Sequence, residues 1–290
     1  MTARTKTQND YFERINKVLL YIHNHLDEKL ELEHLASISN FSSFHFQRIM
    51  KAYLKESLGS YITRARLDRA ASTLITSSKA ISDIALNCGY ESHASFSKAF
   101  KKRFTCSPLK FREESGAVKM ETTYVQLNTQ NTMMKLKCKI KNVKPQKVIY
   151  VTTIGPYKGD GIGQAWEKVC LFAQKNKLFG FNTQFIGISH DDPGITETEK
   201  LRYDACVSIR KEAKPEGEVG YKEIEGGKYA IFRHNGPYEN FEKSYAYIIQ
   251  EWLPESGEQL RELPCLEKYL NQPDEVKPED LKTDIYIPLQ

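Results

Sequence analysis

The chain has 290 residues, of which 40% are hydrophobic and 27% charged, a composition typical of globular proteins. No apolar run approaches the roughly 20 residues that span a membrane, and the polar N-terminus lacks a signal peptide, so we expect a cytoplasmic protein without membrane contact. The six cysteines are dispersed without C-x-x-C spacing, which argues against a disulfide framework or a metal site. We expect no cofactor.

The excess positive charge lies in the N-terminal part of the chain. Residues 1–114 hold 18 Lys and Arg against 12 Asp and Glu, whereas the remaining residues hold 24 against 25. A local positive excess favours a polyanionic partner for that part alone. The length predicts two domains, so this partner is expected for only one of them.

The first predicted element is an amphipathic helix that follows a tail, expected to be disordered, at residues 1–9. Its apolar side chains recur at helical spacing and are Phe12, Ile15, Val18, Leu19, Ile22 and Leu26. This helix opens a domain that we place at residues 10–114 and expect to be all-α.

A helix-turn-helix pattern then occurs twice. The two copies correspond at an offset of 49 residues before the turn and 50 after it: Leu32, Leu35, Ala36 and Phe41 match Ile81, Ile84, Ala85 and Tyr90, and Phe46, Ile49 and Lys51 match Phe96, Ala99 and Lys101. Chance must produce the pattern twice, so the repeat makes the prediction much more specific. A continuous helix over residues 60–77 is predicted to separate the copies as a rigid spacer.

The outer face of the second helix in the first copy carries Phe44, Gln47, Arg48 and Lys51 at helical spacing. Gln and Arg make bidentate contacts with adenine and guanine edges in the major groove of DNA. The alternative is an ordinary solvated surface, and the repeat together with the local charge favours double-stranded DNA as the partner.

The second copy spans residues 81–112, with a short helix, a turn at Gly89 and a second helix for which Ser92 is the expected N-cap. The outer face of that helix is small or basic. Lys98, Lys101, Lys102 and Arg103 are expected to contact phosphate.

Residues 12–112 resemble an AraC-type DNA-binding domain. The closing signature of that family, F-K-x-x-F-x-x-S-P-x-x-[FY]-R, is present as Phe100, Lys101, Phe104, Ser107, Pro108, Phe111 and Arg112. Family members usually have Gly where Thr105 stands. The resemblance places base-reading residues at Phe44, Gln47 and Arg48 in the first copy and at His93, Ala94, Ser97 and Lys98 in the second. The second set has less hydrogen-bonding capacity.

Residues 115–132 are predicted to be a polar linker, and the remaining residues, 133–290, contain a second duplication. The run from Lys147 to Tyr157 aligns with the run from Lys228 to Tyr238 at an offset of 81, and each ends in G-P-Y before a predicted helix. We therefore predict an α+β domain of two pseudo-two-fold-related ββαββ repeats, which would create a cleft where the halves meet.

This half resembles the gyrase-inhibitor-like (GyrI-like) ligand-binding domain, through its two G-P-Y turns and the closing run LPCLEKYLNQPDEVKPEDLKTDIYIPL. The resemblance implies a hydrophobic, often cationic small-molecule effector near one acidic residue, which falls on Glu267. The repeat aligns Gly187 with Glu267 at an offset of 80, which suggests a cleft with a carboxylate on one side and open space for a ligand cation on the other. The alternative for Glu267 is an exposed glutamate paired with Lys268.

Aromatic side chains are expected to line the cleft. The candidates are Trp166, Phe185, Tyr157 and Tyr238, although the two tyrosines also suit a role in packing their turns.

Three functions fit this pattern. The first is a DNA-binding transcriptional regulator controlled by the effector, with RNA polymerase as a candidate partner and no enzymatic activity. The second is a hydrolase in which Glu267 acts as a general acid or base on reactive drug-like molecules. The third is a constitutive DNA-binding protein whose C-terminal half contacts other proteins.

Overall fold

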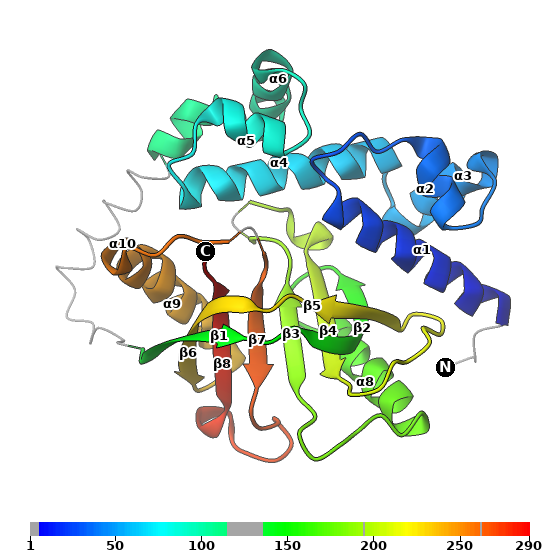
Figure 1. The fold of residues 1–290 in the computed structure, drawn as a ribbon, viewed down its shortest axis with the longest axis vertical. Coiled ribbons are helices and arrows are strands. Elements are labelled where there is room, and N and C mark those ends of the chain that lie inside the picture. Colours follow the sequence, from blue (N-terminus) through cyan, green and yellow to red (C-terminus); the bar gives the residue numbers. More distant parts are fainter. Residues whose placement is uncertain (1–5, 115–135, 194, 262) are drawn as a thin grey trace. The chain divides into compact units, whose positions relative to one another are not determined.

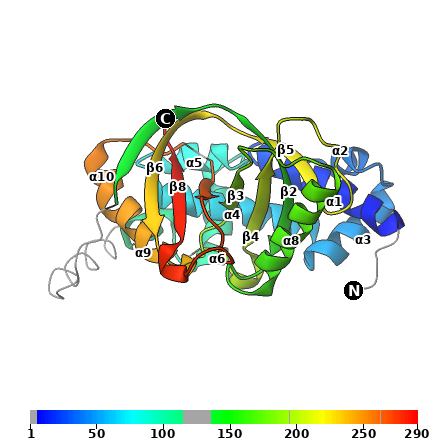
Figure 2. The same cartoon turned by 90° about the horizontal axis from the view of Figure 1, so that it is seen from below.

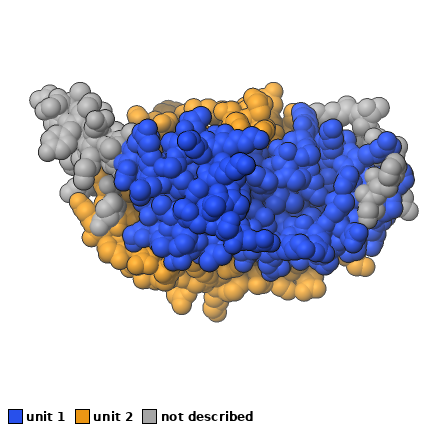
Figure 3. All heavy atoms as spheres, turned by 90° about the horizontal axis from the view of Figure 1, so that it is seen from above, with its two compact units in different colours: residues 1–120, 215–220 blue, residues 121–214, 221–290 orange. Residues whose placement is uncertain are grey.

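The computed structural model describes residues 6–114, 136–193, 195–261 and 263–290, and the predicted linker at 115–132 lies outside these ranges. The chain forms two compact units, Met1–Met120 with Pro215–Gly220, and Glu121–Lys214 with Tyr221–Gln290 (Figure 3). None of the described helices is both long and apolar enough to cross a membrane.

The first unit is helical, as predicted. Its helices are α1 (Lys6–Asn24), α2 (Leu32–Ile38), α3 (Ser43–Leu54), α4 (Leu58–Thr76), α5 (Ile81–Asn87) and α6 (His93–Phe104), and residues 108–114 are also helical (Figure 1). Because α1 begins at Lys6, the prediction of a disordered tail is wrong for residues 6–9. The predicted spacer is confirmed as α4, with α3 near one end and α6 near the other in Figure 1.

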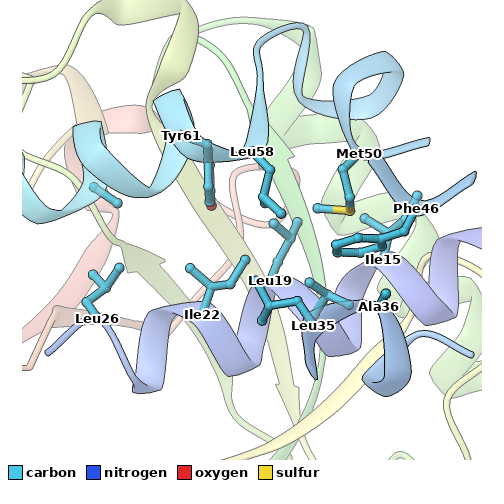
Figure 4. Close-up of a cluster of buried hydrophobic side chains, with 12 residues drawn as sticks. Ile15, Leu19, Ile22, Leu26, Leu35, Ala36, Phe46, Met50, Leu58 and Tyr61 are labelled. Carbon is cyan, nitrogen blue, oxygen red and sulfur yellow. The ribbon is translucent and has the colours of Figure 1, made fainter. Parts of the chain in front are cut away.

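The apolar stripe of α1 packs into the first helix-turn-helix copy. Ile15, Leu19 and Ile22 are buried with side chains from α2, α3 and α4 (Figure 4). The buried stripe of α3 is Phe46 and Met50, and the equivalent positions of α6 are buried Phe96 and Phe100. Burial of each such side chain stabilises the fold by about 1.5–3 kcal/mol. It also fixes which face of α3 and α6 remains outside.

The two copies share backbone features that the sequence alone only partly indicates. Ser92 is confirmed as the N-cap of α6, because its hydroxyl accepts the Ser95 N–H at 3.2 Å. Asn40 and Gly89 occupy the same turn position and both have positive φ, 53° and 73°. A Cβ at Gly89 would lie 2.5 Å from the Leu26 carbonyl oxygen, so glycine is required there for space as well as for conformation.

A buried ion network joins α4 to α6. Arg64 bonds to Glu56 at 2.8 Å and approaches Asp68 at 3.6 Å, and Arg103 bonds to Asp68 at 2.8 Å. The Arg103 side chain is only 16% exposed and points toward α4. The prediction that Arg103 contacts phosphate is therefore wrong, because this guanidinium is paired inside the unit.

The second unit is an α+β domain, as predicted. Its strands are β1 (Cys138–Val143), β2 (Gln146–Ile154), β3 (Phe185–Ser189), β4 (Arg202–Ser208), β5 (Gly220–Ile224), β6 (Gly227–Asn235), β7 (Cys265–Tyr269) and β8 (Lys282–Pro288). They form one sheet in the order β1-β6-β8-β7-β3-β4-β2-β5. If β1 is exchanged with β5, β2 with β6, β3 with β7 and β4 with β8, the order reads in reverse. This symmetry is consistent with two ββαββ units, and that detail remains our interpretation.

Helices pack on one face of this sheet. α8 (Asp160–Lys175) lies against β2 and β4, and a second helical run consists of α9 (Phe241–Ala246), the π-helical η3 (Tyr247–Trp252) and α10 (Leu253–Ser256). In that run Ile248 packs on Phe232 and Ile285. The opposite face carries a separate apolar cluster that includes Val148, Ile186 and Leu266.

Candidate functional site: a buried carboxylate among aromatic rings

Glu267 lies at the centre of the sheet, on the face that the helices cover. It is on β7, directly opposite Gly187 of β3, and is 5% exposed. The next residue, Lys268, points to the other face because side chains alternate along a strand. The alternative of an exposed Glu267 paired with Lys268 is therefore wrong.

Tyrosine hydroxyls bind both oxygens of this carboxylate. Tyr269 donates to Oε2 at 2.8 Å and Tyr245 donates to Oε1 at 3.1 Å. Burial raises the pKa of Glu267 above its ordinary value, although hydrogen bonds from Tyr269, Tyr245 and Ser189 oppose that rise. The result is a carboxylate that is costly to keep charged and that gains from a nearby cation.

Gly187 makes room for this hydroxyl network. A Cβ there would lie 2.4 Å from the Tyr203 hydroxyl and 2.7 Å from the Tyr269 hydroxyl, which are 2.9 Å from each other. The prediction of open space for a ligand beside Gly187 is therefore wrong, because two tyrosine hydroxyls fill it. The missing Cβ serves the positioning of Tyr203 and Tyr269.

The structure brings most of the predicted aromatic residues to this network. Trp166 lies 5.6 Å from Tyr269 and 6.1 Å from Phe185, measured between ring centroids. Tyr238 lies 5.3 Å from Tyr269, and burial together with the Glu267 charge raises the pKa of Tyr238 to about 12. Aromatic faces beside a carboxylate form the kind of surroundings that attract organic cations.

Tyr157 has a different role. Its hydroxyl accepts the Asp191 N–H at 3.0 Å and lies 2.8 Å from the Asp191 carbonyl oxygen, so it holds a turn. Its ring is 6.3 Å from that of Tyr203, at the edge of the cluster. The G-P-Y tyrosines thus differ: Tyr157 is committed to backbone, whereas Tyr238 contacts Tyr269.

Sequence reasoning missed Tyr203, Tyr245 and Tyr269 as members of the site. Tyr269 could have been found, because it lies two residues from Glu267 on the same strand and must share its face. Tyr245 comes from α9, and only the packing of that helix on the sheet brings it to Glu267.

The candidate DNA-reading residues lie on the outer faces of α3 and α6. Gln47, Arg48 and Lys51 of α3 are exposed, and the side chain of Phe44 lies outside the described part of the structure. In α6 the side chains of His93, Ala94, Lys98 and Lys101 are exposed and that of Ser97 is half-buried. Each set therefore forms one accessible face of its helix.

Residues 136–290 match the family model described as the GyrI-like small molecule binding domain, and this match covers more than half of the chain. The chain belongs to the GyrI-like family. Residues 35–114 match a helix-turn-helix domain model. The combination predicted from sequence is confirmed: this is a transcriptional regulator with an AraC-type helix-turn-helix region and a GyrI-like domain.

Several named proteins are similar to parts of this chain. The "Probable transcriptional regulator YgiV" of Escherichia coli K12 is 38% identical over 109 residues, which cover 37% of this chain and 68% of that protein. The "Transcriptional regulator Rob" of Salmonella typhimurium is 35% identical over 101 residues, 35% of each chain. The "Probable transcription factor PqrA" of Proteus vulgaris is 38% identical over 101 residues, 34% of this chain and 83% of that protein.

Among solved structures, the EcmrR–DNA complex covers 90% of this chain and 99% of its own at 14% identity and a TM-score of 0.47. The C-terminal domain of AraT from Geobacillus stearothermophilus covers 35% of this chain and 84% of its own at 31% identity and a TM-score of 0.34. These scores are too low for any residue of those structures to be transferred to this chain.

Proposed function

We propose that the chain reads double-stranded DNA with α3 and α6 and senses a hydrophobic organic cation at Glu267. The observation that carries the second part is the Glu267 carboxylate, which is 5% exposed, lies among aromatic rings and has only uncharged hydrogen-bond partners among the described residues. The positive excess of residues 1–114 supports the first part. Such a protein acts where chromosomal DNA is, in the cytoplasm, with RNA polymerase as a candidate partner.

The proposal assigns base reading chiefly to Gln47 and Arg48. Both are exposed, Arg48 on the face of α3 opposite buried Phe46 and Met50 and Gln47 on the flank of that face. Lys98 and Lys101 of α6 are exposed cations without a comparable bidentate geometry, so they serve mainly as phosphate contacts. Specificity should therefore depend more on α3 than on α6.

Replacing Arg48 with Ala tests this assignment. Binding to a duplex selected from a random pool should weaken by about 1–3 kcal/mol, because one bidentate base contact is lost, whereas binding to unrelated DNA should change little. Fluorescence anisotropy at fixed salt measures both affinities. Lys101→Ala is the comparison, and it should weaken both by similar factors. An equal loss on both duplexes for Arg48→Ala would make Arg48 a phosphate contact and contradict the assignment.

The effector assignment is tested with cinnamyltrimethylammonium, an aromatic cation, and cinnamyl alcohol, its uncharged counterpart. Calorimetry should show that the cation binds the full-length protein more tightly than the alcohol. Glu267→Gln should weaken binding of the cation by about tenfold or more, because the charge interaction is lost. Glu199→Gln, which changes an exposed glutamate, is the matched control. Equal binding by wild type and Glu267→Gln would remove Glu267 from the effector site.

We propose binding without turnover at Glu267, which leaves the hydrolase as the competing function. Both carboxylate oxygens already accept tyrosine hydroxyls, which suits a fixed electrostatic partner for a cation. Incubation of the cation, or of reactive esters with the same aromatic body, should return the compounds unchanged by mass spectrometry. A product whose formation requires Glu267 would favour the hydrolase.

A further inference from the structure

A cavity of about 330 Å³ lies in the second unit, on the face of the sheet opposite Glu267. The cavity is lined by the connection from β1 to β2 and the connection from β5 to β6. Because each connection joins strands at opposite ends of the sheet order, it crosses the sheet, and Figure 2 shows the chain arching over one side there. The volume is at the lower end of the range of about 300–1,000 Å³ that small-molecule sites occupy. The space therefore fits a compact ligand better than a protein segment.

Apolar side chains make up most of the wall of this cavity. They come from five strands and are Ile186, Ile224, Tyr229, Leu266 and Tyr286. The same residues belong to the apolar cluster on this face. A ligand here must therefore offer an apolar body to match the wall.

The interior of the cavity carries positive charge. Lys268 lines it and is half-buried, and in the described part of the chain no carboxylate forms a salt bridge with it. Its partner across the β7–β8 pair, Asp284, is instead engaged by Arg233 through hydrogen bonds of 2.5 and 3.2 Å. Burial lowers the pKa of Lys268, the charge of Asp284 opposes this shift, and a bound anion beside the ammonium group would oppose it further.

The rim adds no net charge. Lys144 and Glu225 both line the cavity and both are exposed, so water screens them. Gln146 and Gln184, joined by a hydrogen bond of 3.0 Å, supply neutral polar groups on the remaining wall. A single half-buried cation in an apolar cavity matches a monoanion and not a polyphosphate.

We propose that this cavity is a second ligand site, which binds a small aromatic or aliphatic carboxylate with its charge at Lys268 and its body against the apolar wall. β7 then serves two sites of opposite charge preference, with Glu267 on one face and Lys268 on the other. This second site does not depend on effector binding at Glu267.

Cinnamate, an aromatic monocarboxylate, is the test ligand. Calorimetry on the full-length protein should show one cinnamate per chain, with cinnamyl alcohol weaker by about tenfold or more because it lacks the charge. Lys268→Met, which keeps an apolar chain of similar length, should weaken binding of cinnamate by a similar factor. Ile224→Trp, which places a larger side chain into the cavity, should also weaken it.

Two controls separate this site from that of Glu267. Lys282→Met changes an exposed lysine on β8 and should leave cinnamate binding unchanged, and Glu267→Gln should do the same. Thermal unfolding of each variant checks that the fold is retained. The proposal is overturned if cinnamate does not bind wild type at millimolar concentration, if Lys268→Met binds it as wild type does, or if Glu267→Gln alters its affinity.

Discussion

At the scale of single residues, the position of Glu267 depends on the lack of a Cβ atom at Gly187. Because Gly187 has no Cβ, the hydroxyls of Tyr203 and Tyr269 approach each other to 2.9 Å above β3, and Tyr269 can bind the carboxylate. The site is thus built across neighbouring strands, because the space left at Gly187 of β3 is filled by hydroxyls from Tyr203 of β4 and Tyr269 of β7.

Gly187→Ala should disturb this arrangement. The added methyl group would force both hydroxyls away, so we expect a loss of about 1–3 kcal/mol in the free energy of unfolding and weaker binding of cinnamyltrimethylammonium. Chemical denaturation and calorimetry measure the two effects. Gly180→Ala, where a Cβ meets nothing within 4 Å, is the control and should change neither. A Gly187→Ala protein with unchanged affinity would show that the hydroxyl network does not position Glu267.

The raised pKa of Glu267 gives a pH dependence with a definite sign. A carboxyl whose pKa is higher in the folded state than its ordinary 4.5 stabilises the fold below that value, and this stabilisation is lost as the pH rises through the folded-state pKa. Wild type should therefore gain stability relative to Glu267→Gln as the pH falls from about 8 towards 4.5, while its affinity for the cation falls. Thermal unfolding and calorimetry across this range measure both. A stability difference that does not change with pH would contradict the shift.

Glu267 could be singled out from sequence because the resemblance to the GyrI-like family places that family's acidic residue there, and the repeat aligns it with Gly187. Strand alternation predicts which residues share its face. What fills the space beside Gly187 could not be predicted. A glycine opposite a carboxylate is compatible both with an open cleft and with side chains that reach over it. Only the paths of Tyr203 and Tyr269 in three dimensions decide between them.

At the scale of elements, the ends of α3 and α6 have the same backbone conformation. Lys55 follows α3 with φ 58° and Thr105 follows α6 with φ 63°, both left-handed. Glycine is the residue that adopts this conformation without steric cost, and a β-branched residue such as threonine is strained in it. The departure from the family pattern at Thr105 thus carries a local strain, and α6 still ends at the expected position.

Thr105→Gly should relieve that strain. We expect the free energy of unfolding to rise by about 0.5–1 kcal/mol, since relief of the left-handed conformation exceeds the added entropy of the unfolded chain. Lys55→Gly, without a β-branch to relieve, should gain less. Denaturation by urea measures both variants. Destabilisation by Thr105→Gly would mean that the hydrogen bond from the Thr105 hydroxyl to the Phe104 carbonyl outweighs the strain.

Arg103 of α6 shows a limit of prediction from a helical sequence pattern. Lys102 and Arg103 are neighbours in a basic run, and both looked suited to phosphate. The structure separates them, because Arg103 bonds to Asp68 of α4 whereas Lys102 is exposed. Spacing along one helix predicts its buried stripe, but a partner on another helix is decided by packing.

At the scale of the whole molecule, the excess positive charge and the buried carboxylate site lie in different parts of the chain. The positive excess belongs to the part with the two helix-turn-helix copies, and the buried carboxylate with its aromatic rings belongs to the GyrI-like part. Regulation requires the effector to have different affinities for the DNA-competent and DNA-incompetent states.

That coupling must be reciprocal. If cinnamyltrimethylammonium changes the affinity for a selected duplex by about fivefold or more, saturating duplex must change the affinity for the cation by the same factor. Anisotropy with and without cation, and calorimetry with and without duplex, give the two factors. Glu267→Gln should bring both factors to one, which means that neither ligand then changes the affinity for the other. Two factors of one in wild type would favour a constitutive DNA-binding protein.

The matched left-handed positions at the turns and helix ends have a practical consequence. Asn40 and Lys55 bracket one recognition helix as Gly89 and Thr105 bracket the other, and Phe46 and Phe96 anchor the inner faces. The two helices therefore have the same backbone framework, and we predict that the outer face of one can be transplanted onto the other while each keeps its own buried stripe. A chain with the α3 outer face on both helices would present the same side chains twice, and we predict that it selects DNA that contains two copies of one half-site.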